Sequence, residues 1–217
     1  MNNFEKIIFN LDKEVESINN PNWVSMTADT IGVLTEIIEQ EERTENIKNG
    51  QRVMDLGSGS GTAAFTWARN GYKVIGIEID TELYNISINA QEKHSELKKL
   101  GVQFYNGSYY PVEYKKTSRT RRIENRILKQ YGKKNMYFIS FTDTIYADNN
   151  IDMKKIDIFY AYAWPFQMPS IFEMFYTHAR DDAKLIAIGP NRDAILQKYP
   201  ELTIKYNTIK KNVKKNN

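Results

Sequence analysis

Apolar residues recur along the chain with the periods that helices and buried strands require. Between residues 3 and 18 they fall at helical spacing, at Phe4, Ile7, Ile8, Leu11, Val15 and Ile18. This spacing predicts an amphipathic helix that lies on the rest of the protein. A second helical pattern follows at Ile31, Leu34, Ile37 and Ile38. We therefore expect residues 1–45 to form N-terminal helices that pack on the core, and residues 46–210 to form one domain.

The middle of the chain contains a glycine-rich turn between two short apolar runs. Residues 52–61 read RVMDLGSGSG, and residues 73–80 read KVIGIEID. The first run predicts a buried strand that ends at the glycines, because residues without a Cβ can form a tight turn and let a ligand approach the backbone. From Thr62 the pattern is helical. The order strand, glycine turn, helix, strand is typical of the first half of a nucleotide-binding α/β domain.

Two kinds of ligand are compatible with this turn. Residues 59–64 match the dinucleotide pattern G-x-G-x-x-A, and Glu78 lies at a suitable distance for a ribose. That match leaves Asp55 unexplained, because a carboxylate two residues before the first glycine would repel a pyrophosphate. A cationic ligand would favour a carboxylate at that place.

The segments DLGSGSG and GIEID, in this order, resemble motif I and the acidic end of the second strand in class I methyltransferases that depend on S-adenosylmethionine (SAM). The resemblance implies an α/β fold with a Rossmann-like, doubly wound and mostly parallel sheet and helices on both faces. It implies that Asp55 lies near the amino and sulfonium groups of SAM and that Glu78 binds both ribose hydroxyls. The cofactor-binding residues that it implies are Thr27, Asp55, Gly57, Ser58, Gly59, Gly61, Glu78, Ile79 and Asp143.

Residues 22–90 are similar, more narrowly, to the archaeal and mitochondrial protein-lysine methyltransferases. In that subgroup a turn that ends in threonine closes over the methionyl end of SAM, which implies this role for Thr27 in the run WVSMT. The chain departs from the subgroup at Ser25 and Met26, where a proline is usual. Thr27 or Asp29 would also serve simply as the cap of the helix that follows.

Two segments compete for the third strand, residues 102–105 and residues 136–141. We favour the second, because Thr142 and Asp143 follow it and the next strand is near in the sequence. Asp143 then takes the family position that contacts the adenine amino group. If residues 102–105 form the strand instead, that position moves to about Ser108.

With residues 136–141 as the third strand, residues 102–134 form an insertion that carries a basic helix. Its cations are Lys115, Lys116, Arg119, Arg121, Arg122, Arg126 and Lys129, and tyrosines lie among them. Basic and aromatic residues together can bind phosphates and stack bases, and the same charges suit an acidic protein or an anionic metabolite. A solvated helical face explains the charges equally well. The segment 115–134 is therefore a candidate site for an anionic partner.

Residues 156–163 are almost continuously apolar, as a parallel strand buried on both faces should be. Class I methyltransferases contact their acceptor at the end of this strand, and those that act on exocyclic or amide amines carry Asn or Asp there. Ala163 cannot hydrogen-bond an amine. Methyl transfer mainly requires alignment of the donor and the acceptor, so no catalytic base stands out. Candidate catalytic residues, chosen only because they lie at this strand, are Tyr160, Tyr162 and Trp164.

The remaining segments and the composition set further limits. Residues 183–189 predict a fifth strand and residues 202–209 a last one, so the sheet is expected to be shortened at its C-terminal end, before a disordered basic tail at 211–217. The 217 residues include no Cys and only two His, which argues against disulfides and a metal site. The net charge of +3 is small, and no stretch is long and apolar enough for a membrane span. A soluble, cytoplasmic protein is expected.

The sequence therefore predicts a SAM-dependent methyltransferase with SAM as its cofactor and an unidentified acceptor. Protein lysine is the first candidate acceptor, a small molecule the second, and RNA the third. The alternatives are a SAM-binding protein without transferase activity and an NAD-dependent oxidoreductase.

Overall fold

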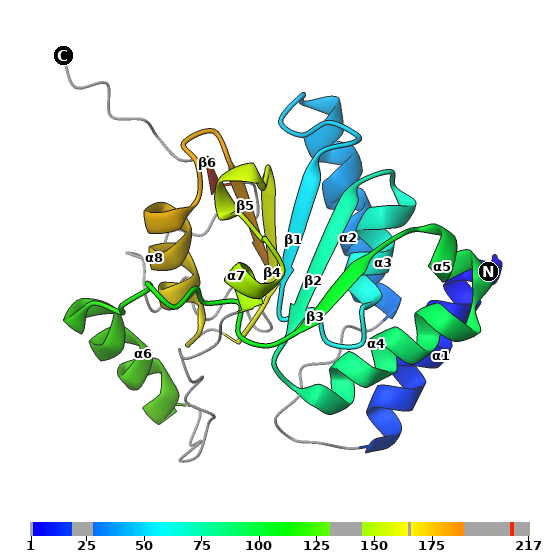
Figure 1. Ribbon diagram of the computed structural model, residues 1–217, viewed down its shortest axis with the longest axis horizontal. Coiled ribbons are helices and arrows are strands. Elements are labelled where there is room, and N and C mark those ends of the chain that lie inside the picture. The colour runs from blue at the N-terminus through cyan, green and yellow to red at the C-terminus, as the bar shows by residue number, and fades with distance from the viewer. Residues whose placement is uncertain (1, 19–27, 131–144, 165, 189–208, 211–217) are drawn as a thin grey trace. The chain divides into compact units, whose positions relative to one another are not determined.

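The computed structural model describes residues 2–18, 28–130, 145–164, 166–188 and 209–210 (Figure 1). The chain forms two compact units, Met1–Tyr109 and Tyr110–Asn217. In the described part of the chain no helix is both long and apolar enough to cross a bilayer.

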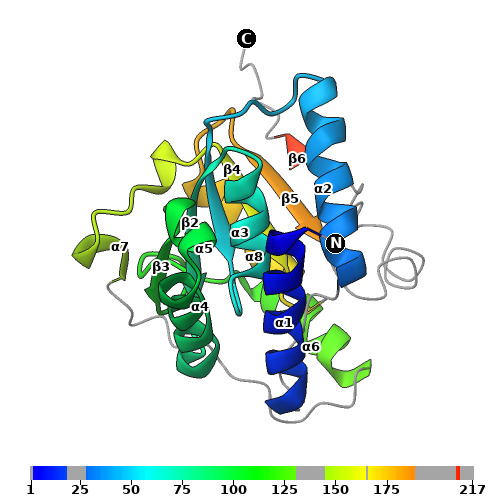
Figure 2. The same ribbon diagram turned by 90° about the vertical axis from the view of Figure 1, so that its right-hand side faces the viewer.

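The first unit consists of three parallel strands and their helices. Its elements in chain order are α1 (Asn3–Ile18), α2 (Ala28–Arg43), β1 (Arg52–Leu56), α3 (Thr62–Arg69), β2 (Lys73–Glu78), α4 (Thr81–Lys93), α5 (Ser95–Lys99) and β3 (Gln103–Asn106). The strands pair in parallel in the order β3-β2-β1. Helix α3 packs on β1 and β2, α4 packs on β2 and β3, and α1 contacts α2, α3 and α4 (Figure 2).

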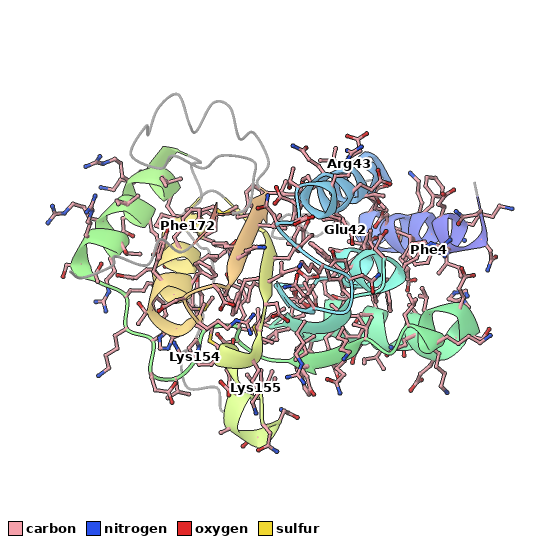
Figure 3. All side chains as sticks on the ribbon, turned by 90° about the horizontal axis from the view of Figure 1, so that it is seen from above. Phe4, Glu42, Arg43, Lys154, Lys155 and Phe172 are labelled. Carbon is pink, nitrogen blue, oxygen red and sulfur yellow. The ribbon has the colours of Figure 1, made fainter. Side chains whose placement is uncertain are left out.

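The two N-terminal helices form as their apolar spacing predicts, and each is held on the first unit by a polar contact as well as by its apolar face. The Arg69 guanidinium lies over the ring of Phe4 on α1, 4.5 Å from the centroid. The Tyr72 hydroxyl donates to Glu42 on α2 at 2.7 Å. Figure 3 labels Phe4 and Glu42 at these positions.

The third strand is β3, at Gln103–Asn106, which pairs in parallel with β2. The preference for residues 136–141 is therefore wrong, and the expected insertion cannot begin at residue 102. Residues 136–141 lie outside the described residues. Strand β3 is short, and of its four residues only Phe104 is buried while Tyr105 is half-buried. Such a strand lacks the continuous apolar run of a parallel strand buried on both faces. The long apolar run at 136–141 was for this reason a misleading signal.

The second unit contains the remaining strands. Its described elements are α6 (Ser118–Gln130), α7 (Ile145–Asp148), the 3-10 helix η1 (Met153–Lys155), β4 (Ile158–Tyr162), α8 (Met168–His178), β5 (Lys184–Ile188) and β6 (Ile209–Lys210). Strands β4 and β5 are parallel, and β6 is antiparallel to β5. Phe159 of β4 packs edge-on against Phe175 of α8, with ring centroids 5.5 Å apart. The predicted α/β, Rossmann-like fold with mostly parallel strand pairing is confirmed.

Gly76 in β2 allows a close approach between β2, β3 and the glycine turn. A Cβ at this position would lie 2.7 Å from Cδ1 of Phe104 and 2.9 Å from Oγ of Ser58. We therefore expect Gly76→Ala to lower the free energy of unfolding by roughly 1–3 kcal/mol, the usual cost of overpacking a core. Urea unfolding followed by circular dichroism measures this change.

The matched control is Gly32→Ala in the exposed middle of α2, where a Cβ would meet nothing within 4 Å. Alanine loses less conformational entropy than glycine when a helix forms, so the free energy of unfolding of this variant should rise by about 0.5–1 kcal/mol. Two variants that shift stability in the same direction would contradict the steric account of Gly76.

Candidate functional site

The glycine turn between β1 and α3 has a backbone that few residues other than glycine adopt. Gly57, Gly59 and Gly61 have φ angles of 83°, 55° and 88°, in the left-handed region where a Cβ is strained. The backbone N–H groups of Gly57 and Ser58 both donate to the Ile77 carbonyl, at 2.9 and 3.0 Å. The turn is thus fixed directly to β2.

Space around the turn differs from one glycine to the next. A Cβ on Gly61 would lie 2.8 Å from Cζ of Phe104 and 2.9 Å from Cε2 of Phe65, so this glycine is needed for packing. At Gly59 a Cβ would meet no atom within 4 Å. Gly59 is therefore a point at which a ligand can approach the backbone of the turn.

Asp55 lies under the turn, near the end of β1, and is only 1% exposed. Burial, together with the charge of Glu78, raises the pKa of Asp55 to about 8, although a hydrogen bond from the Ala64 N–H acts in the opposite direction. Its Oδ2 atom has no hydrogen-bond partner, and the buried Oγ of Ser58 has none either. Buried polar atoms without partners are costly, and two of them at one turn mark a place where a ligand can supply the missing bonds.

Glu78 ends β2 and holds two turns together. Its Oε2 accepts from the Gly59 N–H at 2.7 Å, and its Oε1 accepts from the Asp80 N–H at 2.8 Å. Burial raises the pKa of Glu78, and these two backbone bonds oppose that shift. A carboxylate has about four lone-pair sites, so Glu78 keeps acceptor capacity for a ligand beside these bonds.

The end of β3 completes this edge of the first unit. The Gly107 N–H donates to the Glu78 carbonyl at 2.8 Å, and Ser108 and Tyr109 are buried directly after it. Tyr109 lies beside the turn, with its Cε1 3.7 Å from the position of a Cβ on Gly57. Ile79, in contrast, is 43% exposed. The residues that follow all three strands therefore meet at one edge, as expected for parallel strands.

Asp12 of α1 is a member of this site that is not among the residues predicted from the sequence. Its Oδ1 accepts from the Thr62 hydroxyl at 3.0 Å, and Thr62 begins α3 directly after the glycine turn. Asp12 is 5% exposed, its Oδ2 has no partner, and burial raises its pKa to about 7. The signal was present in the sequence, because Asp12 occupies a position on the apolar stripe of its helix.

The structure brings together seven of the nine predicted cofactor-binding residues. These are Asp55, Gly57, Ser58, Gly59, Gly61, Glu78 and Ile79. Thr27 and Asp143 lie outside the described residues. In the second unit Tyr160 is fully buried within β4, Tyr162 is half-buried at the strand's end, and Trp164 packs against Ile127 and Phe166.

The charges at the turn favour a cationic group over an anionic one. Asp12, Asp55 and Glu78 are carboxylic acids buried around the turn, and residues 57–61 contain only glycine and serine. A pyrophosphate placed there would meet buried acids. An ammonium or sulfonium group would instead stabilise their ionised forms.

The raised pKa of Asp55 should appear as a pH dependence of stability. A carboxyl group whose pKa is higher in the folded than in the unfolded state stabilises the fold at low pH and loses that contribution as the pH rises. The folded value is about 8 against an ordinary 3.8, so the window runs from about pH 4 to 8. In the wild type, titration of Asp55 should lower the free energy of unfolding by at most about 1.4 kcal/mol for each pH unit across this window. We expect Asp55→Asn to lack this contribution to the pH dependence. Urea unfolding at pH 5, 6, 7 and 8 measures it.

Glu39→Gln, which removes an exposed acid of α2, is the control for this series. A pH slope that changed equally in both variants, or that did not change in Asp55→Asn, would show that Asp55 does not titrate in this window.

No family model and no curated protein matches the chain, but solved structures resemble it in fold. An RNA methyltransferase from Salinibacter ruber in complex with S-adenosyl-L-homocysteine is 16% identical, over 76% of each chain, with a TM-score of 0.46. A precorrin-6y C5,15-methyltransferase from Geobacter metallireducens is 10% identical, over 81% of this chain and 69% of that one, with a TM-score of 0.48.

A SAM-dependent methyltransferase from Geobacter sulfurreducens in complex with S-adenosyl-L-homocysteine is 17% identical, with a TM-score of 0.45. The match covers 83% of this chain but only 53% of that one, so the chain spans about half the length of that protein. These similarities do not support the narrower resemblance to protein-lysine methyltransferases. At such identities they concern the fold alone.

Proposed function

We propose that the first unit binds SAM at the glycine turn and that the protein transfers the methyl group of SAM to an acceptor. The observation that carries this proposal is the buried Asp55 carboxyl group under the turn, with an unpartnered oxygen and with Glu78 beside it. A bound cation would stabilise the ionised form of this carboxyl group, whereas a pyrophosphate would be repelled by that form.

The residues at the turn suit two parts of SAM, the charged methionyl part and the ribose. Asp55 would stabilise the ammonium and sulfonium charges, and the open backbone at Gly59 would let the ligand approach closely. Glu78, which keeps acceptor capacity beside its backbone bonds, would accept from the ribose hydroxyls. The backbone bonds that it already accepts from Gly59 and Asp80 keep its carboxylate in position for this.

The adenine would lie beyond Glu78, between Ile79 and the end of β3. Ile79 presents an exposed apolar side chain there, which a planar base would cover. Because β3 is residues 103–106, the proposal moves the adenine contact from Asp143 to Ser108. Thr27 keeps its proposed role at the methionyl end.

Bound SAM supplies an electrophilic methyl group on a sulfonium, and transfer needs an acceptor held in line with it. The chain's own residues would orient the donor and exclude water, which is enough for catalysis by alignment. The acceptor is not specified by the site. A protein lysine and a small molecule are the two acceptors to screen, and an additional base would be needed for a protonated amine.

Calorimetric titration of the purified protein with SAM, S-adenosylhomocysteine and NAD tests the ligand class. We expect SAM and S-adenosylhomocysteine to bind and NAD to give no heat. Glu78→Gln should weaken SAM binding by about tenfold to a hundredfold, since one of two charge-assisted hydrogen bonds to the ribose is lost. The Glu39→Gln variant of α2 is the control. NAD binding in place of SAM would contradict the proposed ligand and favour the oxidoreductase alternative.

Proton release provides a second test of the role of Asp55. With a pKa of about 8, Asp55 is mostly protonated at pH 7 in the free protein. A bound cation lowers that pKa, so SAM binding at pH 7 should release up to about one proton. Titrations in buffers of different ionisation enthalpy count the protons. The pKa values of Asp12 and Glu78 are raised as well, so Asp55→Asn should release fewer protons than the wild type. Equal release by both proteins would contradict the assignment.

Transferase activity needs its own measurement. Tritium transfer from methyl-labelled SAM to protein, peptide and metabolite fractions would identify an acceptor. SAM affinity with no labelled product in any fraction would favour the alternative of a SAM-binding protein without transferase activity.

A further inference from the structure

Helix α6 of the second unit has two faces of opposite character. Thr120, Glu124 and Ile127 are buried on the inner face. The exposed face carries Arg119, Arg121, Arg122, Asn125, Arg126 and Lys129, which we call the basic face. The sequence alone is compatible with either a solvated surface or a binding surface at these charges.

The inner face holds the helix firmly on α8. The Thr117 hydroxyl accepts from the Thr120 N–H at 3.2 Å and so caps the helix, while the Thr117 N–H donates to Glu173 of α8 at 3.2 Å. Ile127 packs against Phe166 in an apolar cluster. The basic face is therefore carried by a fixed helix, which lowers the entropy cost of binding a partner there.

The charges of the basic face are not neutralised within the described residues. Glu124 is the one carboxylate in the sequence of α6, and it is engaged by the Lys116 ammonium at 3.0 Å and by the Ser170 hydroxyl. The described side chains include no carboxylate in an ion pair with the basic face.

This arrangement opposes helix stability. Arg122 and Arg126 are like charges four residues apart, and Arg119, Arg121 and Arg122 lie near the positive end of the helix dipole. Both effects destabilise the free helix. A bound polyanion would reverse both.

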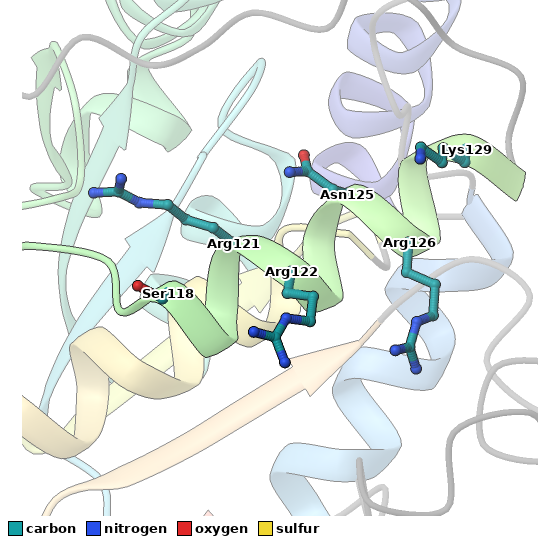
Figure 4. Close-up of a pocket in the computed structure, with 6 residues that line it drawn as sticks. All are labelled: Ser118, Arg121, Arg122, Asn125, Arg126 and Lys129. Carbon is teal, nitrogen blue, oxygen red and sulfur yellow. The ribbon is translucent and has the colours of Figure 1, made fainter.

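The geometry of the basic face suits a repeated anion. In Figure 4, Arg122 and Arg126 point to the same side of the helix, while Arg121, Asn125 and Lys129 follow a second row. With Ser118 they line an open pocket of about 490 Å³. Successive members of a row are one helical turn apart, about 5–6 Å. Guanidinium groups bind phosphate through two parallel hydrogen bonds, and Ser and Asn side chains donate to phosphate and sugar oxygens.

We propose that the basic face of α6 binds the phosphate backbone of a nucleic acid. Phosphates recur at regular intervals along a strand, as the guanidinium groups recur along the helix, whereas the carboxylates of an acidic protein have no fixed interval. The face carries mostly arginine, the residue best suited to phosphate. This inference concerns docking and does not depend on the proposed SAM site.

The test measures the binding of a fluorescein-labelled 20-nucleotide RNA by fluorescence anisotropy at several salt concentrations. The variant Arg121→Gln/Arg122→Gln/Arg126→Gln should bind at least tenfold more weakly than the wild type. Losing three phosphate contacts should also reduce the slope of log K against log salt by about 2, at roughly 0.7 per contact for a single strand. A DNA strand and a duplex of the same length show which nucleic acid is preferred.

The matched control is Lys93→Gln/Lys98→Gln/Lys99→Gln, which removes three exposed cations of α4 and α5 in the first unit. Both variants lower the formal net charge of +3 by three, to zero, so a non-specific charge effect would weaken them equally. We expect the control to bind RNA within about twofold of the wild type, because its lysines make no phosphate contact.

Three results would overturn the inference: no RNA binding by the wild type at low salt, equal loss in both triple variants, or displacement of the RNA by polyglutamate as efficiently as by unlabelled RNA. The last result would identify an acidic protein as the partner. SAM titration of the α6 variant should match the wild type, so a failure of this inference is distinguishable from a failure of the proposed function.

Discussion

The hydrogen bonds that Glu78 accepts from two backbone turns are the interaction on which the candidate site depends. One carboxylate oxygen holds Gly59 in the turn after β1, and the other holds Asp80 at the start of α4. Asp80 in turn caps α4 through the N–H groups of Glu82 and Leu83. The left-handed glycine backbone and the beginning of the next helix are thus fixed by one buried side chain.

This construction places acids where water cannot stabilise their charge. Asp55 and Asp12 share the neighbourhood of the turn with Glu78, and burial raises the pKa of all three. The free protein therefore carries an unfavourable electrostatic environment that a cationic ligand would relieve. Buried acids with raised pKa values commonly occur at functional sites, which is why this edge of the first unit is the basis for the proposed function.

Helix α6 shows the same principle on an exposed surface. Its single acid is directed inward to Lys116 and Ser170, so the outer cations are left without compensation from their own helix. The net charge of the sequence does not reveal this, because it includes the negative charge of Glu124, whose side chain is buried on the opposite face of the helix from the exposed arginines. Although the net charge of the chain is small, we expect one of its surfaces to bind a polyanion and its glycine turn to bind a cation.

The sequence by itself determined the local elements: β1, the glycine turn, β2, the amphipathic α1 and the basic α6 all follow from periodicity and from glycine, which act between near neighbours. It also singled out Asp55 and Glu78 as candidate binding residues, because their positions relative to the strands are local. Only the tertiary structure decided that residues 103–106 form β3, that Asp12 reaches Thr62 fifty residues away, and that Glu124 faces inward. These outcomes depend on which surfaces meet, and burial between distant segments leaves no period in the sequence.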